Sequence, residues 1–326
     1  MSTPPSISYI IPFMNEEATL GELFQRIAEV TRAAGRTFEV IFIDDGSTDA
    51  GVKKVEELAA AHSEARLIQL RGNFGKSAAL AAGFDHAQGE IIFTLDADLQ
   101  DDPKEIPRFL EALETQDGGL DVVSGYKQTR HDPWHKVLPS RVFNWLVRKL
   151  TGVPLHDINC GFKCYRAEVI RSVKLYGELH RFIPALAIWN RFKVGEIVVL
   201  HHPRRFGVSK FGARRFFRGL MDLMTVTFLL KYDRKPLHFF GKVGGFATMA
   251  GLALCGYLSV LWCMGQSIGH RPLLSLGILL IVIGVQILTT GLIAELVVHV
   301  AGDSRPYQIR RTLGLEPPGS NRDTRR

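Results

Sequence analysis

The chain of 326 residues is poor in cysteine, of which it has four. So few cysteines exclude the disulfide-rich scaffolds of small secreted domains. Cys160 and Cys164 have three residues between them and no second pair with zinc-ligand spacing follows, so a structural zinc site is not expected either. The N-terminus shows no basic stretch followed by an apolar run, and the sequence therefore predicts no cleaved signal peptide.

Charged side chains are absent from two long segments, Val243–Gly265 and Pro272–Ala294. Each segment has 23 residues, and a helix of that length crosses a hydrocarbon core of about 30 Å. Two buried helices of a soluble protein are the alternative, but such long charge-free runs are rare in soluble cores. We therefore expect a hairpin of two transmembrane helices within residues 237–300.

Basic residues flank this hairpin but hardly occur inside it, where Arg271 lies in the short connection 266–271. The flanking cations are Arg214, Arg215, Arg218, Lys231, Arg234, Lys235 and Lys242 on one side and Arg305, Arg310, Arg311, Arg322, Arg325 and Arg326 on the other. The positive-inside rule then places both termini in the cytoplasm. Interleaved basic and apolar residues in 211–236 predict an amphipathic helix at the membrane surface, and an amphipathic helix packed on the soluble domain is the alternative. Residues 301–326 are expected to form a basic cytoplasmic tail.

Apolar runs alternate with helical patterns over residues 1–210, which predicts an α/β domain with a mostly parallel, Rossmann-like sheet. The expected strands are Ser6–Ile11, Glu39–Ile43, Arg66–Leu70, Glu90–Leu95 and Asp121–Ser124, and the expected helices are Glu17–Ala33, Asp49–Ala61 and Gly75–Ala87. Polar clusters follow three of the strands, at 12–17, 44–49 and 96–102. Ligands of such sheets bind beyond the carboxyl ends of the strands, so we expect these clusters to form one site.

Two carboxylates, Asp96 and Asp98, come directly after the fourth expected strand. Their negative charges repel each other, so the arrangement calls for a cation. Hard oxygen ligands favour Mg²⁺ or Mn²⁺, which in proteins commonly also holds substrate phosphates. The alternative, a helix N-cap before Pro103, fits Asp101 or Asp102 better than Asp96 or Asp98. The sequence therefore predicts a metal and phosphate site.

Two further strand ends suit a nucleotide. Asp44 offers an acceptor for a ring N–H or a ribose hydroxyl, whereas Asp49 is explained by capping of the next helix. The segment Arg71–Lys76 combines glycines, a helix start and the Lys76 cation, which suits a diphosphate. It matches neither the P-loop nor the Gly-x-Gly-x-x-Gly pattern, so taken alone it is weak evidence. The net charge is +7, but the sequence contains no nucleic-acid-binding motif, and we therefore expect no nucleic-acid partner.

These segments together resemble family 2 glycosyltransferases with the GT-A fold. The resemblance rests on residues 10–17, 43–49 and 95–100. Residues 157–163 and 202–211, together with the two-helix C-terminus, are similar to the bacterial undecaprenyl-phosphate glucosyltransferases, which are related to the dolichol-phosphate mannosyltransferases. The resemblance implies a protein integral to the bacterial cytoplasmic membrane that takes a nucleotide sugar and a polyprenyl phosphate as partners.

The resemblance also assigns roles to individual residues. The nucleotide-sugar site would comprise Pro12, Glu16, Asp44, Asp45, Lys76, Asp96, Ala97, Gln100, Arg204 and Lys210. Catalysis would involve Asp98, Asp96, Asp157 and Arg205, with Asp98 and Asp96 as the metal ligands. Asp157 could instead orient basic side chains or the sugar, and a loop cap is its alternative explanation. The acceptor phosphate would lie among Lys127, Arg130, Lys136, Ser140 and Arg141, cations and a hydroxyl that suit a phosphate. A solvated basic face is the alternative explanation of this last set.

No Glu-Asp pair occurs in 176–184, where transferases that glycosylate a hydroxyl carry their general base, and the Gln-x-x-Arg-Trp motif of processive synthases is missing too. A phosphate monoester needs no base because its second pKa is about 6. We therefore expect transfer of one sugar to undecaprenyl phosphate, with UDP-glucose as the first candidate donor, and the resemblance implies inversion at the anomeric carbon. GDP-mannose, UDP-N-acetylhexosamine or aminoarabinose donors, a hydroxyl acceptor, and a non-catalytic scaffold or lipid transporter stay as alternatives. The glycines of the first span also permit a homo-oligomer.

Overall fold

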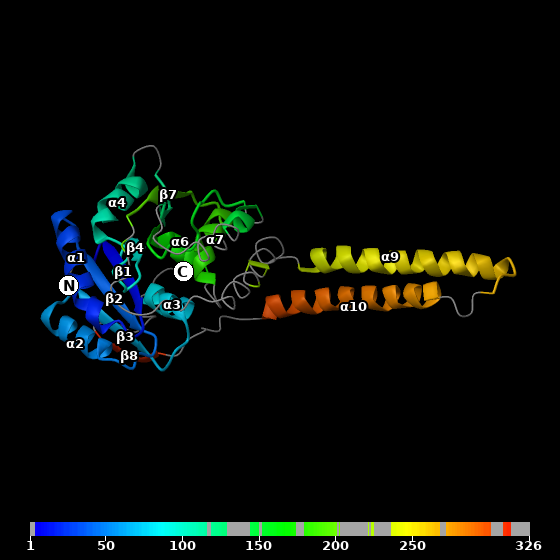
Figure 1. Ribbon diagram of the computed structural model, residues 1–326, viewed down its shortest axis with the longest axis horizontal. Helices are drawn as coiled ribbons and strands as arrows, with labels where there is room; N and C mark the ends of the chain where they lie inside the picture. The colour runs from blue at the N-terminus through cyan, green and yellow to red at the C-terminus, as the bar shows by residue number, and fades with distance from the viewer. Residues whose placement is uncertain are drawn as a thin grey trace, which may run out of the picture. The chain divides into compact units, whose positions relative to one another are not determined.

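The computed structural model describes residues 4–115, 119–128, 144–149, 152–173, 179–200, 202, 221, 223–224, 236–267, 272–300 and 309–313. The chain divides into two compact units (Figure 1). The first unit joins Met1–Val226 with Arg305–Arg326, and the second comprises Thr227–Ser304. The second unit is therefore an insertion near the end of the first.

The first unit is built on an eight-stranded sheet in the order β7-β5-β6-β4-β1-β2-β3-β8. The strands are β1 (Ile7–Phe13), β2 (Phe38–Asp44), β3 (Ala65–Leu70), β4 (Ile91–Thr94), β5 (Val122–Tyr126), β6 (Lys163–Arg166), β7 (Val194–Val198) and β8 (Ile309–Leu313). The pairs β4–β1, β1–β2, β2–β3 and β5–β7 are parallel, whereas β6 is antiparallel to β4 and β5, and β8 is antiparallel to β3. The predicted mostly parallel sheet is confirmed.

Helices cover both faces of this sheet. They are α1 (Glu17–Ala33), α2 (Gly51–Ala61), α3 (Lys76–His86), α4 (Ile106–Glu114), α6 (Ala167–Ser172) and α7 (Ile183–Trp189), with short 3-10 helices η1 (Pro103–Glu105) and η2 (Leu179–Phe182). One buried core contains side chains of α1, α2 and α4, and the other contains side chains of α3, α6 and α7. The β1 residues alternate between these cores, because successive strand side chains point to opposite faces.

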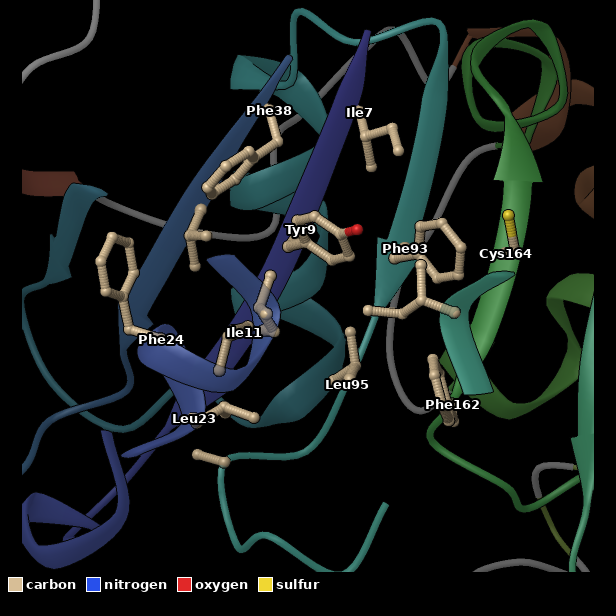
Figure 2. Packing of buried hydrophobic residues seen from close by; sticks show 14 of the residues in the cluster. Ile7, Tyr9, Ile11, Leu23, Phe24, Phe38, Phe93, Leu95, Phe162 and Cys164 are labelled. Carbon is tan, nitrogen blue, oxygen red and sulfur yellow. The ribbon is translucent and has the colours of Figure 1, made fainter. Parts of the chain in front are cut away.

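Aromatic packing fills the first core (Figure 2). The Tyr9 ring of β1 stacks on Phe93 of β4, with ring centroids 5.3 Å apart. The buried Tyr9 hydroxyl lies 2.7 Å from Thr31 Oγ1 of α1, so its polar end is satisfied. The core thereby fixes β1 and β4 relative to each other, and with them the polar residues that follow both strands.

The second unit contains two long apolar helices, α9 (Pro236–Cys263) and α10 (Pro272–Val300), which lie side by side (Figure 1). Both Leu237–Cys263 and Pro272–Ala294 are long and apolar enough to cross a membrane. Glycines bring the helices together: a Cβ on Gly251 would lie 2.6 Å from the Gly277 carbonyl oxygen, and one on Gly244 would lie 2.6 Å from that of Gly284. These two glycines are thus used within the hairpin.

The C-terminal tail departs from the expected separate segment, because Ile309–Leu313 pairs with β3 as an edge strand. The first unit thus extends beyond residue 210, and it also includes the part of the chain that follows the hairpin. The amphipathic helix predicted for 211–236 lies largely outside the described residues. Of its members before α9, Met221, Leu223 and Met224 are described, and they are helical.

Candidate active site

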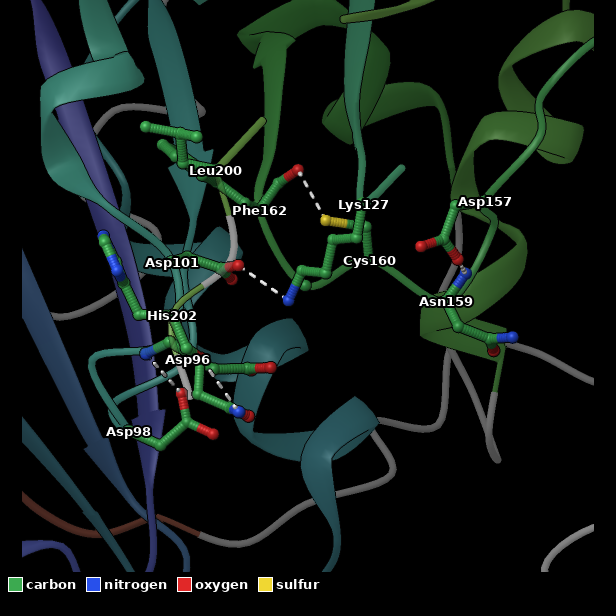
Figure 3. Close-up of polar contacts among 12 residues, drawn as sticks. Asp96, Asp98, Asp101, Lys127, Asp157, Asn159, Cys160, Phe162, Leu200 and His202 are labelled. Carbon is green, nitrogen blue, oxygen red and sulfur yellow. Dashed lines mark hydrogen bonds and ion pairs between the residues drawn. The ribbon is translucent and has the colours of Figure 1, made fainter. Parts of the chain in front are cut away.

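The end of β4 presents the two acidic residues of the predicted metal site. Asp96 forms an ion pair with Lys76, the first residue of α3. Its carboxylate also lies against Gly161, where a Cβ would be 2.5 Å from Oδ2. Asp98 is half-buried, and its Oδ1 accepts a hydrogen bond of 3.2 Å from the Gln100 N–H (Figure 3). Both carboxylates therefore lie where the parallel strands end.

Burial disfavours the charged form of Asp96, but the charge and hydrogen bond of Lys76 outweigh it and, with the charge of Lys127, hold the pKa well below the usual 3.8. Asp96 is thus a carboxylate at every ordinary pH, which suits a metal ligand. Among the described residues, no group of three or more His, Cys, Asp and Glu side chains is placed to hold a metal. A divalent ion held by Asp96 and Asp98 would complete its ligands with phosphate oxygens and water, as Mg²⁺ commonly does.

The end of β2 is organised by its own two aspartates. Asp44 is buried, and its Oδ1 accepts the Ser47 N–H at 2.8 Å. Asp45 accepts N–H groups from the start of α3, with Phe74 N at 2.7 Å and Gly75 N at 3.0 Å. The amides expected to cradle a diphosphate therefore bind a carboxylate of the protein itself, and Lys76 is the residue of that segment that contacts Asp96. The diphosphate role of Lys76 stays a prediction.

The loops after β1 and β2 are locked together. Asp49 Oδ2 accepts the Glu17 N–H at 3.1 Å, and the Glu17 carboxylate accepts the Ala50 N–H at 2.7 Å, so each helix start is bonded by the other loop. The N-cap position of α2 is Ala50, one residue after the predicted Asp49, but Asp49 Oδ1 still accepts the N–H of Gly51, the first residue of α2, at 3.0 Å. Pro12 and Glu16 lie half-buried at this edge. Their contact with a nucleotide sugar stays a prediction.

The turn after Asp98 is fastened to His202. Gln100 O accepts the His202 N–H at 2.9 Å, and the His202 ring Nε2 lies 3.1 Å from Asp102 Oδ2. Asp102 also caps η1, as its Oδ1 accepts the Lys104 N–H at 3.1 Å. Ala97, in the same turn, is buried in the core. The predicted donor-site residues Arg204, Arg205 and Lys210 follow His202 in sequence but lie outside the described residues.

Lys127, predicted to bind the acceptor phosphate, forms an ion pair of 2.7 Å with Asp101 (Figure 3). The Lys127 side chain is 14% exposed and that of Asp101 is 1% exposed. Burial disfavours the ammonium, but the negative charge of Asp101 outweighs it and raises the pKa of Lys127 above its usual value. Arg130, Lys136, Ser140 and Arg141, the other members of the predicted pocket, lie outside the described residues.

Asp157 is buried, and its Oδ1 accepts the Asn159 N–H at 3.1 Å (Figure 3). The loop that it opens is held by Lys163, whose buried ammonium donates to the carbonyl oxygens of Ile158 and Cys160. The geometry matches an orienting role for Asp157 as well as a chemical one, and the choice stays open.

Sequence reasoning missed His180, which joins the site from η2. Its Nδ1 lies 2.6 Å from Ser77 Oγ of α3. Burial and the positive charges of Lys76, Arg181 and Lys163 hold the pKa of His180 well below 6.5, so the ring is neutral at pH 7. A single histidine in residues 176–184 belongs to no motif that would predict a role in the site. Lys163 and Asp101 were missed as well, although both stand inside motifs that did attract notice.

Acidic and basic side chains thus gather at the carboxyl ends of a mostly parallel sheet with helices on both faces, which is the edge where such folds bind their ligands. The sequence model of Glycosyl transferase family 2 matches residues 8–174. The chain is also 40% identical to dodecaprenyl-phosphate galacturonate synthase of Rhizobium johnstonii, over 94% of this chain and 92% of the relative. It is 34% identical to undecaprenyl-phosphate 4-deoxy-4-formamido-L-arabinose transferase of Pseudomonas paraeruginosa, over 95% and 91% respectively. The chain therefore belongs to glycosyl transferase family 2.

Among solved structures, the fold is similar to that of glucosyl-3-phosphoglycerate synthase from Mycobacterium tuberculosis in complex with Mn²⁺ and UDP-glucose. The TM-score is 0.53 at 21% identity, covering 67% of this chain and 79% of the other. The predicted GT-A architecture is thereby confirmed for the first unit, which is called the catalytic unit from here on. At this level of identity the likeness concerns the fold alone.

Proposed function

We propose that the protein transfers one sugar from a nucleotide diphospho-sugar to a polyprenyl phosphate at the membrane. The observation that carries this proposal is similarity at 40% and 34% identity over more than nine-tenths of the chain to two enzymes named for polyprenyl-phosphate products. That similarity includes both apolar helices, so it extends beyond the catalytic unit. A membrane-anchored transferase with a lipid acceptor accounts for both units together.

The chemistry assigned to the site is nucleophilic attack by the acceptor phosphate on the anomeric carbon. Asp96 and Asp98 would hold Mg²⁺ or Mn²⁺, which when bound would neutralise the departing diphosphate. Lys76 lies on Asp96 and would supply a second positive charge to the same group. The acceptor is already an anion near pH 7, so no carboxylate has to remove a proton. Attack from the face opposite the leaving group inverts the anomeric carbon.

For the sugar, we infer nucleotide-linked galacturonate as the first donor to test, ahead of UDP-glucose. The support is the 40% identity to the galacturonate synthase, against 34% to the formamido-arabinose transferase. The test is incubation of the full-length protein with undecaprenyl phosphate, Mn²⁺ and a panel of nucleotide sugars, followed by mass measurement of the lipid product. Absence of any sugar phosphate lipid with every donor would overturn the proposed function, and a product on a hydroxyl would favour a polysaccharide transferase.

The metal role is tested by Asp98→Ala. We expect transfer to fall to background, because a ligand of the ion that neutralises the diphosphate is lost. Asp85→Ala, at an exposed position near the C-terminal end of α3, serves as the control and should retain activity. Membrane extraction and circular dichroism show whether both variants fold. An Asp98→Ala variant with normal transfer would remove this residue from the metal site.

We also propose that α9 and α10 span the cytoplasmic membrane as a hairpin, with the catalytic unit in the cytoplasm. The chain leaves the first unit at Val226 and returns to it at Arg305. Two spans bring the chain back to the side from which it started, as this connectivity requires. Labelling of single cysteines introduced at 267 and 320, before and after permeabilisation of the membrane, tests the orientation.

A further inference from the structure

The ion pair between Lys127 and Asp101 joins two separate strand ends. Lys127 directly follows β5 and Asp101 lies in the turn after β4, and in the sheet these strands are separated by β6. The Nζ–Oδ1 distance is 2.7 Å. Among the described residues, Asp101 Oδ2 has no hydrogen-bond partner. The Lys127 ammonium is therefore the group that compensates this buried carboxylate in the described part of the chain.

A buried carboxylate without a partner is strongly destabilising, so the pair has to stay together once the turn is folded. The turn contains Asp98, whose Oδ1 is bonded to Gln100 N, and Gln100 is bonded in turn to His202. Asp101 follows Gln100, and Asp102 caps η1. The position of Asp98 thus depends on a turn that is held at two points, by the ion pair between Lys127 and Asp101 and by the hydrogen bond between His202 and Gln100.

We propose that Lys127 is a positioning residue, which fixes the metal-binding turn through Asp101 and does not bind the acceptor phosphate. Its side chain is 14% exposed and turned toward a carboxylate, which is the wrong environment for a ligand of an incoming anion. The inference rests on the proposed sugar transfer and replaces the acceptor role expected for Lys127. The phosphate contact then falls to other cations of the site.

A double-mutant cycle separates the two roles. Lys127→Met and Asp101→Asn each leave one buried charge unpaired, and each should lower kcat about tenfold or more, because the turn shifts. The double variant removes both charges and should be no slower than the worse single variant, since a residue that acts only through its partner has nothing left to lose. Lys104→Met, an exposed lysine in the same segment, is the matched control and should be unchanged.

The KM for undecaprenyl phosphate is the second readout. A positioning role predicts a KM within about twofold of wild type in all three variants, because no contact with the acceptor is removed. Effects that multiply in the double variant, together with a raised KM, would overturn the proposal and return Lys127 to the acceptor pocket. Single variants as active as wild type would overturn it too.

Lys127→Arg covers the case in which the single variants do not fold. It keeps the cation, and we expect it to be more active than Lys127→Met at equal folded amounts, as judged by size-exclusion chromatography in detergent. Equal or lower activity of Lys127→Arg would count against the charge pair. Failure of the wild-type protein to transfer any sugar would instead reject the proposed function, so the two failures are distinguishable.

Discussion

At the residue scale, the site depends on one position where no side chain fits. Gly161 faces the Asp96 carboxylate, and a Cβ there would lie 2.5 Å from Oδ2 and 2.8 Å from Cγ. Thr94 Oγ1 donates to the Gly161 carbonyl oxygen at 2.8 Å, so the backbone at this point is held and cannot easily retreat. Asp96 and the 157–161 loop therefore have to move apart if the glycine is replaced.

Gly161→Ala should lower transfer about tenfold or more, because displacement of Asp96 by about 1 Å misplaces a proposed metal ligand. The measurement is kcat/KM at saturating Mn²⁺, with the unfolding temperature measured in parallel. Gly21→Ala is the control, since its Cβ would meet the flexible end of Lys54 at 3.3 Å and touch nothing in the site. Equal activity of the two variants would show that Asp96 has room to adjust.

His180 gives the protein a pH dependence of stability. In the unfolded chain this histidine has a pKa of about 6.5, and in the native protein its pKa is well below 6.5. At a pH between these two values, the unfolded chain binds the proton and the native protein does not. Stability should therefore fall as the pH is lowered below 6.5, with a limiting slope of about 1.4 kcal/mol per pH unit for one group. His180→Asn lacks this titration and should show a flatter profile of unfolding temperature from pH 7 to 5.

Part of this site could be predicted from the sequence. Asp96, Asp98 and Lys76 attracted attention because each directly follows or opens an element with a clear apolar pattern, and the structure brings Asp96 and Lys76 into contact. Asp101, Lys163 and His180 carry no comparable local pattern. Their partners are 26, 3 to 5 and 103 residues away, so for Asp101 and His180 only the folded sheet reveals the pairing.

At the element scale, the regular strand and helix periods were sufficient for β1 to β5 and α1 to α3. The helix predicted at Glu17–Ala33 has those bounds in the structure. The antiparallel β6 and the edge strand β7 were not predicted, because β6 has four residues and follows a loop, and β7 has no clear alternation. Short strands of this kind are specified by their neighbours rather than by their own residues.

The α9–α10 hairpin depends on glycine at its contact positions. Gly251→Leu should destabilise the hairpin, because the added side chain meets the Gly277 backbone at 2.6 Å and forces the helices apart. Gly245→Leu is the matched control, since no atom lies within 4 Å of its Cβ. The yield of a disulfide between cysteines introduced on the two helices reports the approach and should drop for Gly251→Leu alone.

The Gly245→Leu variant also tests whether the protein forms an oligomer through α9. Gly241, Gly245 and Gly256 meet nothing within 4 Å, so they are the glycines of α9 that are not used inside the hairpin. An oligomer formed through α9 would be weakened by Gly245→Leu, which crosslinking in mild detergent would detect. An unchanged crosslinking pattern would argue against contacts of this face between copies.

At the scale of the whole molecule, β8 makes the catalytic unit depend on the far end of the chain. It covers the edge of β3, pairing Leu67 with Leu313 and Ile68 with Thr312. An uncovered edge strand exposes unpaired N–H and C=O groups and invites association with other chains. The five residues of β8 have no pattern that predicts a strand. An edge strand this short is specified by the strand with which it pairs, so the sequence alone did not reveal it.

Truncation after residue 304 should therefore increase amide hydrogen exchange in residues 65–70 and promote aggregation of the purified protein. Truncation after 315 removes most of the basic tail but keeps β8, and it serves as the control. Hydrogen exchange measured by mass spectrometry on both proteins in detergent distinguishes the loss of the strand from the loss of the charges. Equal exchange in β3 would show that β8 does not protect this edge.

The place of β8 in the chain also sets an order of events during synthesis. β3 ends at Leu70 and its partner begins at Ile309, after both long helices. At roughly 5–20 residues per second, the ribosome leaves this edge without its partner for on the order of ten seconds to a minute. The sheet of the first unit is thus completed only after both apolar helices have been synthesised, so a chain that is cut short before residue 309 leaves the β3 edge without its partner.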